Sequence, residues 1–303
     1  MTHYRKPLKK VARIRIAGPD KKGIIATMTS YLYENGCNIE DIDQRIWENF
    51  LVMNMVVDTS GLKSPLPRFL KGLKLAAQKV GTEVEFRPEE KRDVKNVALL
   101  VTKESHCLVD LLKKMRGGGS KKMHGQAVVV IGNQPDLRGV AARFGVPFYY
   151  VSSEKRKEHE AKLIELLQKF EVDLIVLARY MQILSPEFNF RYEGKIINIH
   201  PSLLPAFPGP RSYHQAFNKG VEVVGVTAHF VTTDLDEGPI ITQAAFRVNK
   251  TCDTVEKFME KGRRLETKVL TRAVKLFLED RLTLRRGRVI DSKRIPCLSD
   301  DET

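Results

Sequence analysis

The stretch KIINIHPSLLPAFPGP, residues 195–210, begins as an isoleucine-rich strand and then changes to polar residues and prolines. Isoleucines facing both sides of a strand indicate burial on both faces, which is typical of a parallel sheet covered by helices. Asn198 and His200 end this strand, and residues two apart in a strand project to the same side. The loop that follows is restricted by Pro201, Pro205, Pro208 and Pro210. We therefore expect a buried strand whose two terminal polar side chains are held in fixed directions.

The alternation of strand and helix extends in both directions from this stretch. Apolar runs at 97–102, 127–132 and 172–178 are separated by amphipathic helical patterns, and a long helix is expected from about 254 to 278. The order predicts an α/β domain over residues 89–303, with a Rossmann-like, mostly parallel sheet, helices on both faces and a basic C-terminal tail. Ligands bind such sheets at the carboxyl ends of the strands, where Asn198 and His200 lie.

Residues 1–88 follow a different order. The run VARIRIAG at 11–18 alternates apolar and polar residues as a half-buried strand does, and a helical pattern ends near Gly36. Two strand-like runs, a helix at about 67–80 and a short strand EVEFR complete a βαββαβ order, which predicts a ferredoxin-like α+β domain. The charged stretch at 87–93 is interpreted as the linker between the two domains.

The composition and the charge bear on whether the protein binds nucleic acid or enters a membrane. The formal net charge of +14 is concentrated near the two ends of the chain, and no RNA-binding motif accompanies it. A solvated basic surface explains this charge better than a nucleic-acid partner, although attraction of a polyanionic small molecule or of RNA stays open. No apolar run is long enough to span a membrane and no signal-peptide pattern is present, so we expect a cytoplasmic protein.

The amide and imidazole at 198 and 200 have a chemical and a structural interpretation. An amide can stabilise an oxyanion while an imidazole moves a proton; alternatively, Asn198 caps the loop and His200 packs against prolines. The stretch GVTAHFVTTDLDEGPI, residues 225–240, ends a neighbouring strand in a turn that contains Asp234, Asp236 and Glu237. A carboxylate there can fix the tautomer of His200, stabilise its cation or hold a water, although acidic turns are often structural.

Other kinds of site are less well supported. His200, His214 and His229 lack the spacing of metal ligands, and the chain contains no GxSxG elbow, P-loop or GxGxxG motif. The four cysteines are scattered, which favours free thiols. We interpret His214 and His229 as structural histidines with hydrogen-bond partners.

The two motifs together resemble the signature of the folate-dependent formyltransferases. The resemblance implies that Asn198, His200 and Asp236 act on the formyl group of 10-formyltetrahydrofolate, the expected substrate, with no metal or other cofactor. It also implies that the pterin lies against the backbone of two loops. The folate-binding residues expected from it are Met181, Gln182, Ile183, Leu184, Val231 and Asp234.

Over about residues 11–290 the chain is most similar to the formyltetrahydrofolate deformylases, which carry an N-terminal ACT regulatory domain. The resemblance implies hydrolysis of 10-formyltetrahydrofolate, an amino-acid effector bound near Asp20, Gly23 and Asn38, and a homo-oligomer. Pro201 stands where deformylases usually have a second histidine and is closer to the glycinamide ribonucleotide transformylases. Formyl transfer to such an amine, and a folate sensor without turnover, therefore stay open, with formyl transfer to RNA as a weaker option.

Overall fold

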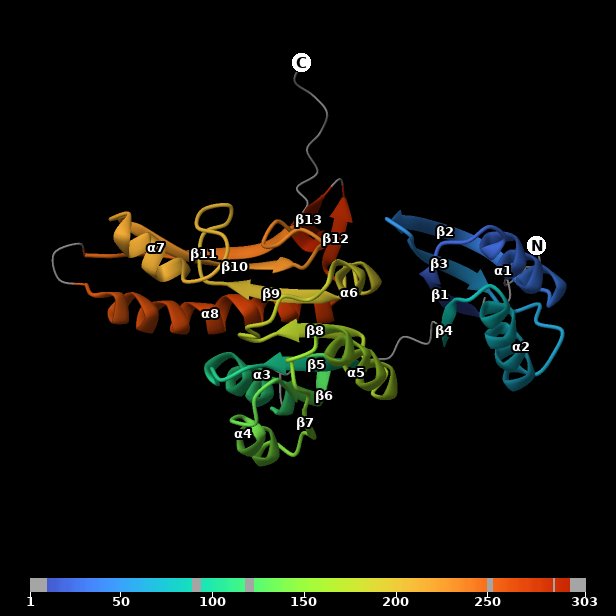
Figure 1. Ribbon diagram of the computed structural model, residues 1–303, viewed down its shortest axis with the longest axis horizontal. Helices are drawn as coiled ribbons and strands as arrows, with labels where there is room; N and C mark the ends of the chain where they lie inside the picture. The colour runs from blue at the N-terminus through green and yellow to red at the C-terminus, as the bar shows by residue number, and fades with distance from the viewer. Residues whose placement is uncertain (1–9, 89–93, 118–122, 250–252, 286, 295–303) are drawn as a thin grey trace, which may run out of the picture. The chain divides into compact units, whose positions relative to one another are not determined.

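The computed structural model describes residues 10–88, 94–117, 123–249, 253–285 and 287–294 (Figure 1). These residues fall into two compact units, which divide between residues 92 and 93. Most of the predicted linker at 87–93 lies outside the described residues.

The smaller unit is built on a four-stranded antiparallel sheet with strand order β2-β3-β1-β4. Its elements are β1 (Val11–Pro19), α1 (Ile24–Glu34), β2 (Asn38–Trp47), β3 (Phe50–Asp58), α2 (Leu66–Lys79) and β4 (Glu83–Pro88). Alternate residues of β1, such as Ile14 and Ile16, pack with Met28 of α1 and Phe69 of α2 in one hydrophobic cluster. Both helices therefore cover the same face of the sheet, and the predicted ferredoxin-like order is confirmed.

The larger unit contains a seven-stranded sheet with strand order β11-β10-β9-β8-β5-β6-β7. Its elements are β5 (Lys95–Val101), α3 (His106–Arg116), β6 (Gly125–Gly132), α4 (Arg138–Arg143), β7 (Phe148–Tyr150), α5 (Arg156–Lys169), β8 (Leu174–Leu177), α6 (Pro186–Arg191), β9 (Ile196–His200), α7 (Ser212–Asn218), β10 (Val223–Phe230), β11 (Ile240–Arg247), α8 (Val255–Leu278), β12 (Leu282–Arg285), β13 (Arg288–Asp291) and a 3-10 helix, Ser292–Arg294. Strands β5 to β9 are parallel, as predicted, whereas β10 is antiparallel to both of its neighbours.

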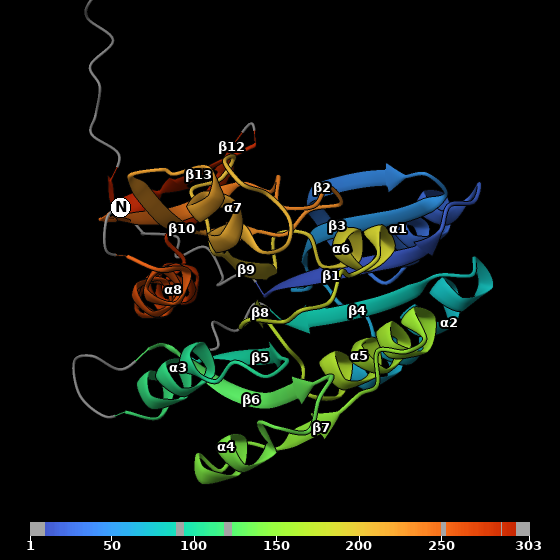
Figure 2. The same cartoon turned by 60° about the vertical axis from the view of Figure 1, so that its left-hand side comes forward.

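Helices cover both faces of this sheet, because its central strands are apolar on both sides. Leu99 of β5 belongs to a cluster with residues of α3, α4 and α8, whereas its neighbour Leu100 packs with residues of α5 and α6. Figures 1 and 2 show these two helical layers on opposite sides of the strands. The arrangement is the predicted α/β fold, and it leaves the loops at the strand ends free to form a site.

The C-terminal part of the chain differs from the prediction, which treated the residues after α8 as a basic tail. Residues 282–291 contain the hairpin β12–β13, with Leu282 and Val289 packed against the core of the larger unit. Arg281 Nη2 lies 2.6 Å from Asp291 Oδ2, so the acidic residue pairs with part of the basic charge. The alternation of apolar residues in this segment is short and lies among arginines, so the sequence alone did not indicate a hairpin.

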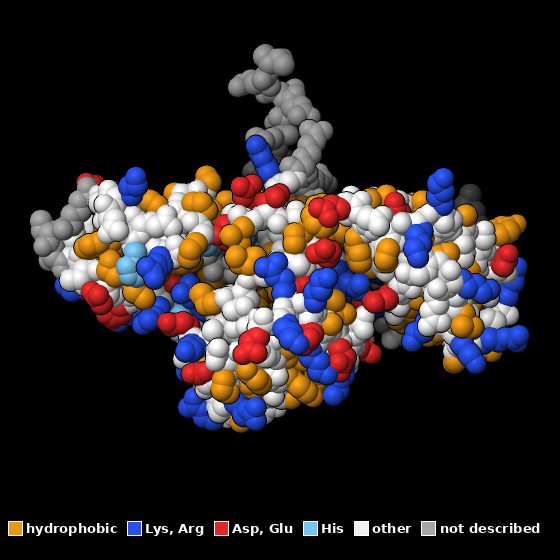
Figure 3. Space-filling view, viewed as in Figure 1, with side chains coloured by type: hydrophobic (Ala, Val, Ile, Leu, Met, Phe, Trp, Pro, Cys, Tyr) orange, Lys and Arg blue, Asp and Glu red, His pale blue; other side chains and the backbone are white. Residues whose placement is uncertain are grey.

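Two surface properties bear on possible partners. On the face of the larger unit drawn in Figure 3, Lys and Arg side chains are interspersed with acidic and apolar ones and do not gather in one patch. In the described residues, no helix combines the length and the hydropathy needed to cross a bilayer.

Candidate active site

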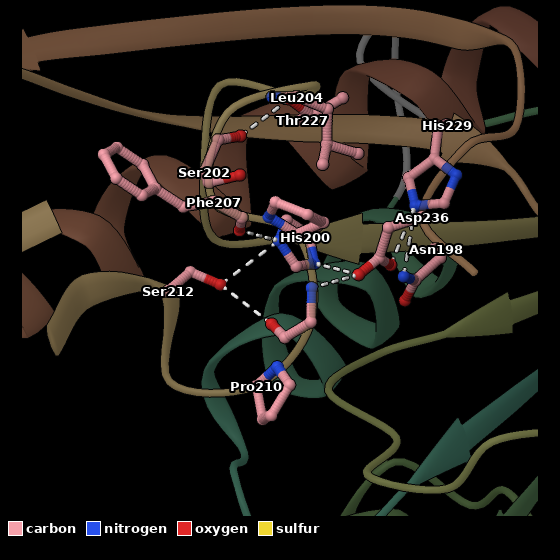
Figure 4. Close-up of polar contacts among 12 residues, drawn as sticks. Asn198, His200, Ser202, Leu204, Phe207, Pro210, Ser212, Thr227, His229 and Asp236 are labelled. Carbon is pink, nitrogen blue, oxygen red and sulfur yellow. Dashed lines mark hydrogen bonds and ion pairs between the residues drawn. The ribbon is translucent and has the colours of Figure 1, made fainter. Parts of the chain in front are cut away.

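The carboxyl end of β9 presents Asn198 and His200 on one face of the sheet, as the two-residue period of a strand predicts (Figure 4). The residue His200 is only 5% exposed, and Asn198 is half-buried. Burial of an imidazole requires that its nitrogens find hydrogen-bond partners. The loop after the strand supplies some of these partners.

The Nε2 atom of His200 faces the loop that follows β9. It lies 3.0 Å from the carbonyl oxygen of Phe207 and 3.1 Å from Ser212 Oγ at the start of α7. The Ser212 hydroxyl in turn lies 3.1 Å from the carbonyl oxygen of Gly209, to which it donates. Because a carbonyl only accepts, Nε2 carries a proton and donates it to Phe207. Phe207, and not the acidic turn, therefore fixes this side of the ring.

The Nδ1 atom of His200 faces the carboxylate of Asp236, with 3.3 Å between Nδ1 and Oδ2. The backbone N–H of Gly209 also donates to Oδ2 at 2.8 Å. Burial alone would raise the pKa of Asp236, but the hydrogen bonds from His200 and Gly209 outweigh it, and the pKa is lowered. These hydrogen bonds therefore favour the ionised form of Asp236.

The acidic turn reaches His200 in a way that the sequence does not reveal. Because β10 is antiparallel to β9, Phe230 at the end of β10 lies opposite Ile197, away from His200. The chain then turns back, and the Phe230 N–H donates to the carbonyl of Pro239 at 2.9 Å. A Cβ at Gly238 would lie 1.7 Å from the carbonyl oxygen of Phe230, so only glycine fits there. This close return carries Asp236 over the face that holds Asn198 and His200.

His229, which was expected to be a structural histidine with hydrogen-bond partners, lies beside Asn198 and Asp236. In the register of β9 and β10 it lies opposite Asn198, and its Nε2 is 3.2 Å from Asn198 Nδ2 and 3.9 Å from Asp236 Oδ1. The residue is 2% exposed. A signal was available, since residue 229 lies in a strand next to the one that carries 198, but the pairing register could not be read from one sequence.

The exit loop after β9 is held by more than its prolines. Thr227 of β10, which is fully buried, donates through Oγ1 to Ser202 O at 2.7 Å and accepts from Leu204 N–H at 3.0 Å. Phe207 and Asp236 adopt positive φ angles of 53° and 58°. Such backbone conformations are costly for residues with side chains and tend to occur at functional sites.

The loop after β8 carries the predicted folate-binding residues 181–184. Met181 and Ile183 are 53% and 62% exposed, whereas Leu184 is buried in the hydrophobic cluster against which Val231 also packs. The two predicted folate loops therefore adjoin one cluster. Asp234 is exposed on the second loop, and its carbonyl accepts from the Thr232 hydroxyl at 3.2 Å.

Two consecutive residues of α5 anchor both ends of the loop 181–184. The buried carboxylate of Glu160 accepts from the N–H of Ser185 at 2.5 Å and from its hydroxyl at 2.6 Å. His159 Nε2 accepts from the hydroxyl of Tyr180 at the other end. The N–H of Met181 also donates to Thr102 Oγ1 at 2.9 Å. Sequence reasoning missed these anchors because nothing in the pattern of α5 indicates what its buried polar residues contact.

One group in the described part of the chain brings together side chains of the kind that bind metals: His106, Cys107 and Glu266. Glu266 is fully buried, and it already accepts from Tyr213 OH at 2.7 Å and pairs with Arg179 Nε at 3.4 Å. Burial raises the pKa of the Cys107 thiol. A metal ion there would compete with the Arg179 cation and with a thiol held in its neutral form, so these residues fit an ion-pair cluster better than a metal site.

The predicted effector residues of the smaller unit do not form one cluster. Asp20 and Gly23 lie in the turn between β1 and α1, and Gly23 has a φ of 92°. Asn38 begins β2 opposite Asp58, which pairs with Val11 at the other end of β1. Within the unit, Asn38 is thus separated from the first two by the length of the sheet.

Comparisons with known proteins identify the class of domain that the larger unit forms. The formyl transferase family model matches residues 95–274, and the ACT domain model matches residues 12–87. The glycinamide ribonucleotide transformylase 1 structure from Symbiobacterium toebii has a TM-score of 0.61 at 36% identity, over 66% of this chain and 94% of that chain. This similarity covers the larger unit and defines a formyltransferase-type catalytic domain.

Other known proteins are similar to this chain over both units, and they identify the family more narrowly. Formyltetrahydrofolate deformylase of Escherichia coli K12 is 39% identical over 289 residues, which is 91% of this chain and 96% of the relative. The formyltetrahydrofolate deformylase structure from Pseudomonas syringae has a TM-score of 0.62 at 31% identity and covers 95% and 96% of the two chains. The chain belongs to the formyltetrahydrofolate deformylase family.

Proposed function

We propose that this protein hydrolyses 10-formyltetrahydrofolate to formate and tetrahydrofolate. The observation that carries the proposal is the His200–Asp236 pair, with 3.3 Å between Nδ1 and Oδ2, on the same face of β9 as the Asn198 amide. An ionised carboxylate, an imidazole that can transfer a proton and an amide donor are the groups that acyl hydrolysis needs. The family membership of the whole chain supports the substrate.

In the proposed mechanism, Asp236 holds a water and takes its proton as the water oxygen bonds to the formyl carbon. The Asn198 amide donates to the oxyanion that forms on the formyl oxygen. The carbon–nitrogen bond then breaks, and the leaving nitrogen takes the proton of His200 Nδ1. As the carbon–nitrogen bond breaks, the oxyanion re-forms the carbonyl group of formic acid, which loses its acidic proton to solvent and leaves as formate. The proton taken from the water passes from Asp236 to Nδ1 and restores the pair.

The two sides of the His200 ring have different tasks in this mechanism. Nε2 donates to the Phe207 carbonyl and keeps its proton, whereas Nδ1 shares a proton with Asp236. Nδ1 is therefore the atom that we assign to proton transfer. Control of the His200 tautomer was one of the roles expected of a carboxylate in the acidic turn, beside stabilising the cation and holding a water. The hydrogen bond from Nε2 to the Phe207 carbonyl supports Phe207 in this role instead.

For the substrate, we propose that the pterin binds against the backbone of 181–184 and of 231–236. The apolar side chains of Met181, Ile183 and Leu235 are exposed along these loops, and a flat heteroaromatic ring would cover them. The anchors from Glu160 and His159 support this assignment, because a loop that recognises a ligand through its backbone must be held in one conformation.

Formyl transfer to an amine is the second candidate, and the transformylase similarity of the larger unit is the observation that keeps it open. One assay separates the two functions. The purified full chain is incubated with 10-formyltetrahydrofolate, with and without glycinamide ribonucleotide, while formate and tetrahydrofolate are measured. Formate release without the amine supports the hydrolase; turnover only with the amine supports the transferase, and binding without either product supports a sensor.

We also propose that the smaller unit binds an amino-acid effector and takes part in homo-oligomer formation, as its match to the ACT domain suggests. Asp20 and Gly23, which share one turn, are the first positions to test. Isothermal titration with free amino acids, repeated on Asp20→Ala, measures this directly. If no amino acid produces heat with the wild-type chain, the effector proposal fails.

A further inference from the structure

The hydrogen-bond partners of His229 determine its tautomer. Nδ1 lies 2.8 Å from the carbonyl oxygen of Phe230, which only accepts, so Nδ1 carries the proton. Burial lowers the pKa of His229 from the ordinary histidine value of 6.5, and the hydrogen bond to Phe230 and the charge of Asp236 offset only part of this effect. The ring is therefore neutral near pH 7, and its Nε2 presents a lone pair.

This lone pair decides the orientation of the Asn198 side chain. Nε2 of His229 lies 3.2 Å from Asn198 Nδ2, and a lone pair accepts from an amide N–H but repels an amide oxygen (Figure 4). A side-chain amide has two possible orientations that differ only in which atom, nitrogen or oxygen, faces a given neighbour. The neutral His229 ring selects one of them, with nitrogen toward His229.

The second N–H of the same amide is the one that the proposed mechanism uses. With the first N–H bound to His229, the second has a fixed direction on the face that also carries His200. In the opposite orientation, the amide oxygen would replace the nitrogen and would repel a developing oxyanion. The His200 imidazole and the Asp236 carboxylate both face the Asn198 side chain, and one donates where the other accepts. These two groups therefore do not by themselves exclude the wrong orientation of the amide.

We propose that His229 is a positioning residue, which holds the Asn198 amide in the orientation that donates to the formyl oxygen. This inference rests on the proposed hydrolysis and extends it to a residue that touches neither the substrate nor the reacting atoms. The glycine at 238 supports the arrangement, because a Cβ there would collide with the Phe230 carbonyl that fixes the His229 tautomer.

The kinetic test compares two substitutions. His229→Leu removes the acceptor and should lower kcat by roughly 10- to 100-fold, with KM changed less than about threefold. His229→Gln offers an amide oxygen near the position of Nε2 and should recover most of this loss. His214→Leu, on an exposed face of α7, is the matched control and should change kcat by less than about twofold.

A double-mutant cycle with Asn198→Ala separates positioning from a general structural effect. If His229 acts through Asn198, adding His229→Leu to Asn198→Ala should cause no further loss of kcat. Two results overturn the proposal: the same fold-loss in both backgrounds, or a His229→Gln enzyme as slow as His229→Leu. An Asn198→Ala enzyme that releases formate at the wild-type rate would instead contradict the proposed mechanism.

A second measurement does not depend on activity. Nitrogen-15 NMR of the histidine-labelled full chain distinguishes a protonated ring nitrogen from one with a lone pair, and the His229→Gln spectrum identifies the signals. We expect His229 to carry its proton on Nδ1 near pH 7. A proton on Nε2 would overturn the positioning role whatever the kinetics show.

Discussion

Two buried carboxylates of the larger unit have similar surroundings and opposite uses. Asp236 pairs with His200, and Glu266 pairs with His106 at 2.9 Å. The difference lies in the remaining partners. Glu266 also accepts from Tyr213 and pairs with Arg179, a guanidinium that does not lose its proton, so its charge is locked. Asp236 faces two histidines and one backbone N–H, and histidine is the side chain that exchanges protons near neutral pH.

Glu266 and Asp236 also differ in the backbone segments that carry them. Glu266 lies within the long helix α8 and connects it to α3, to the loop after β8 and to α7 through its three partners. Asp236 lies in a loop at a positive φ, held in place by the return of the chain at Gly238. We infer that Glu266, whose cationic partner does not titrate, stabilises the fold, whereas the titratable partners and the strained loop of Asp236 suit the catalytic role that we propose for it.

The largest expected effect is on stability and concerns Glu266. Its replacement in Glu266→Ala leaves His106, Arg179 and Tyr213 without their shared partner, and we expect the free energy of unfolding to fall by about 3–5 kcal/mol. Urea unfolding followed by circular dichroism measures this loss. The fluorescence of the single tryptophan, Trp47 in the smaller unit, shows whether that unit is unaffected.

Glu260→Ala, on an exposed turn of the same helix, is the matched control and should cost less than about 0.5 kcal/mol. If Glu266→Ala does not fold, Glu266→Gln keeps the hydrogen bond from Tyr213 and can be measured in its place. A loss equal to that of the control would break the distinction between the two carboxylates.

The next effect is on catalysis and concerns Asp236. In Asp236→Asn the side chain keeps its shape but no longer accepts a proton from water, and kcat should fall by about 10²- to 10³-fold. Formate release from 10-formyltetrahydrofolate at saturating substrate measures it. Glu237→Gln, the exposed neighbour in the same turn, should stay within about twofold of wild type. An Asp236→Asn enzyme that is unstable but fully active per folded molecule would place Asp236 in the same class as Glu266.

A smaller effect is expected at Glu160, whose buried carboxylate holds the loop 181–184, to which we assign pterin binding. Glu160→Gln retains the size of the side chain but loses the charge that accepts from Ser185, which we expect to loosen residues 181–184. KM should rise roughly tenfold, equivalent to about 1.4 kcal/mol, while kcat changes less than about twofold. Glu165→Gln, exposed on the same helix, is the control. A fall in kcat with KM unchanged would show that Glu160 acts on the chemistry and not on the loop.

The sequence predicted those parts of the molecule that depend on local periodicity. The βαββαβ order, the parallel strands β5 to β9 and the projection of Asn198 and His200 from one strand follow from the alternation of apolar residues. The contacts that define the site depend instead on registers between distant segments. His229 opposite Asn198, the return of the acidic turn over His200 and the Phe207 carbonyl at Nε2 come from an antiparallel pairing and from loop closures that leave no periodic trace.

The smallest expected effect is on the pH dependence of stability, and it also probes the contrast between locked and exchangeable charge. The pKa of His229 is lowered from 6.5 by burial, with Asp236 and His200 as the titratable groups that face it. As the pH falls below 6.5, His229 takes up a proton in the unfolded chain but not in the folded chain. The contribution of His229 to the free energy of unfolding is therefore fully present above pH 6.5. It decreases as the pH falls toward the lowered pKa, by up to about 1.4 kcal/mol per pH unit. The free energy of unfolding should fall more between about pH 7.5 and about pH 5.5 in the wild type than in His229→Gln, whereas His214→Gln should behave as the wild type does. Equal decreases in all three proteins would mean that His229 accepts a proton in the folded state as readily as in the unfolded one, and its neutral tautomer would then not be available to orient Asn198.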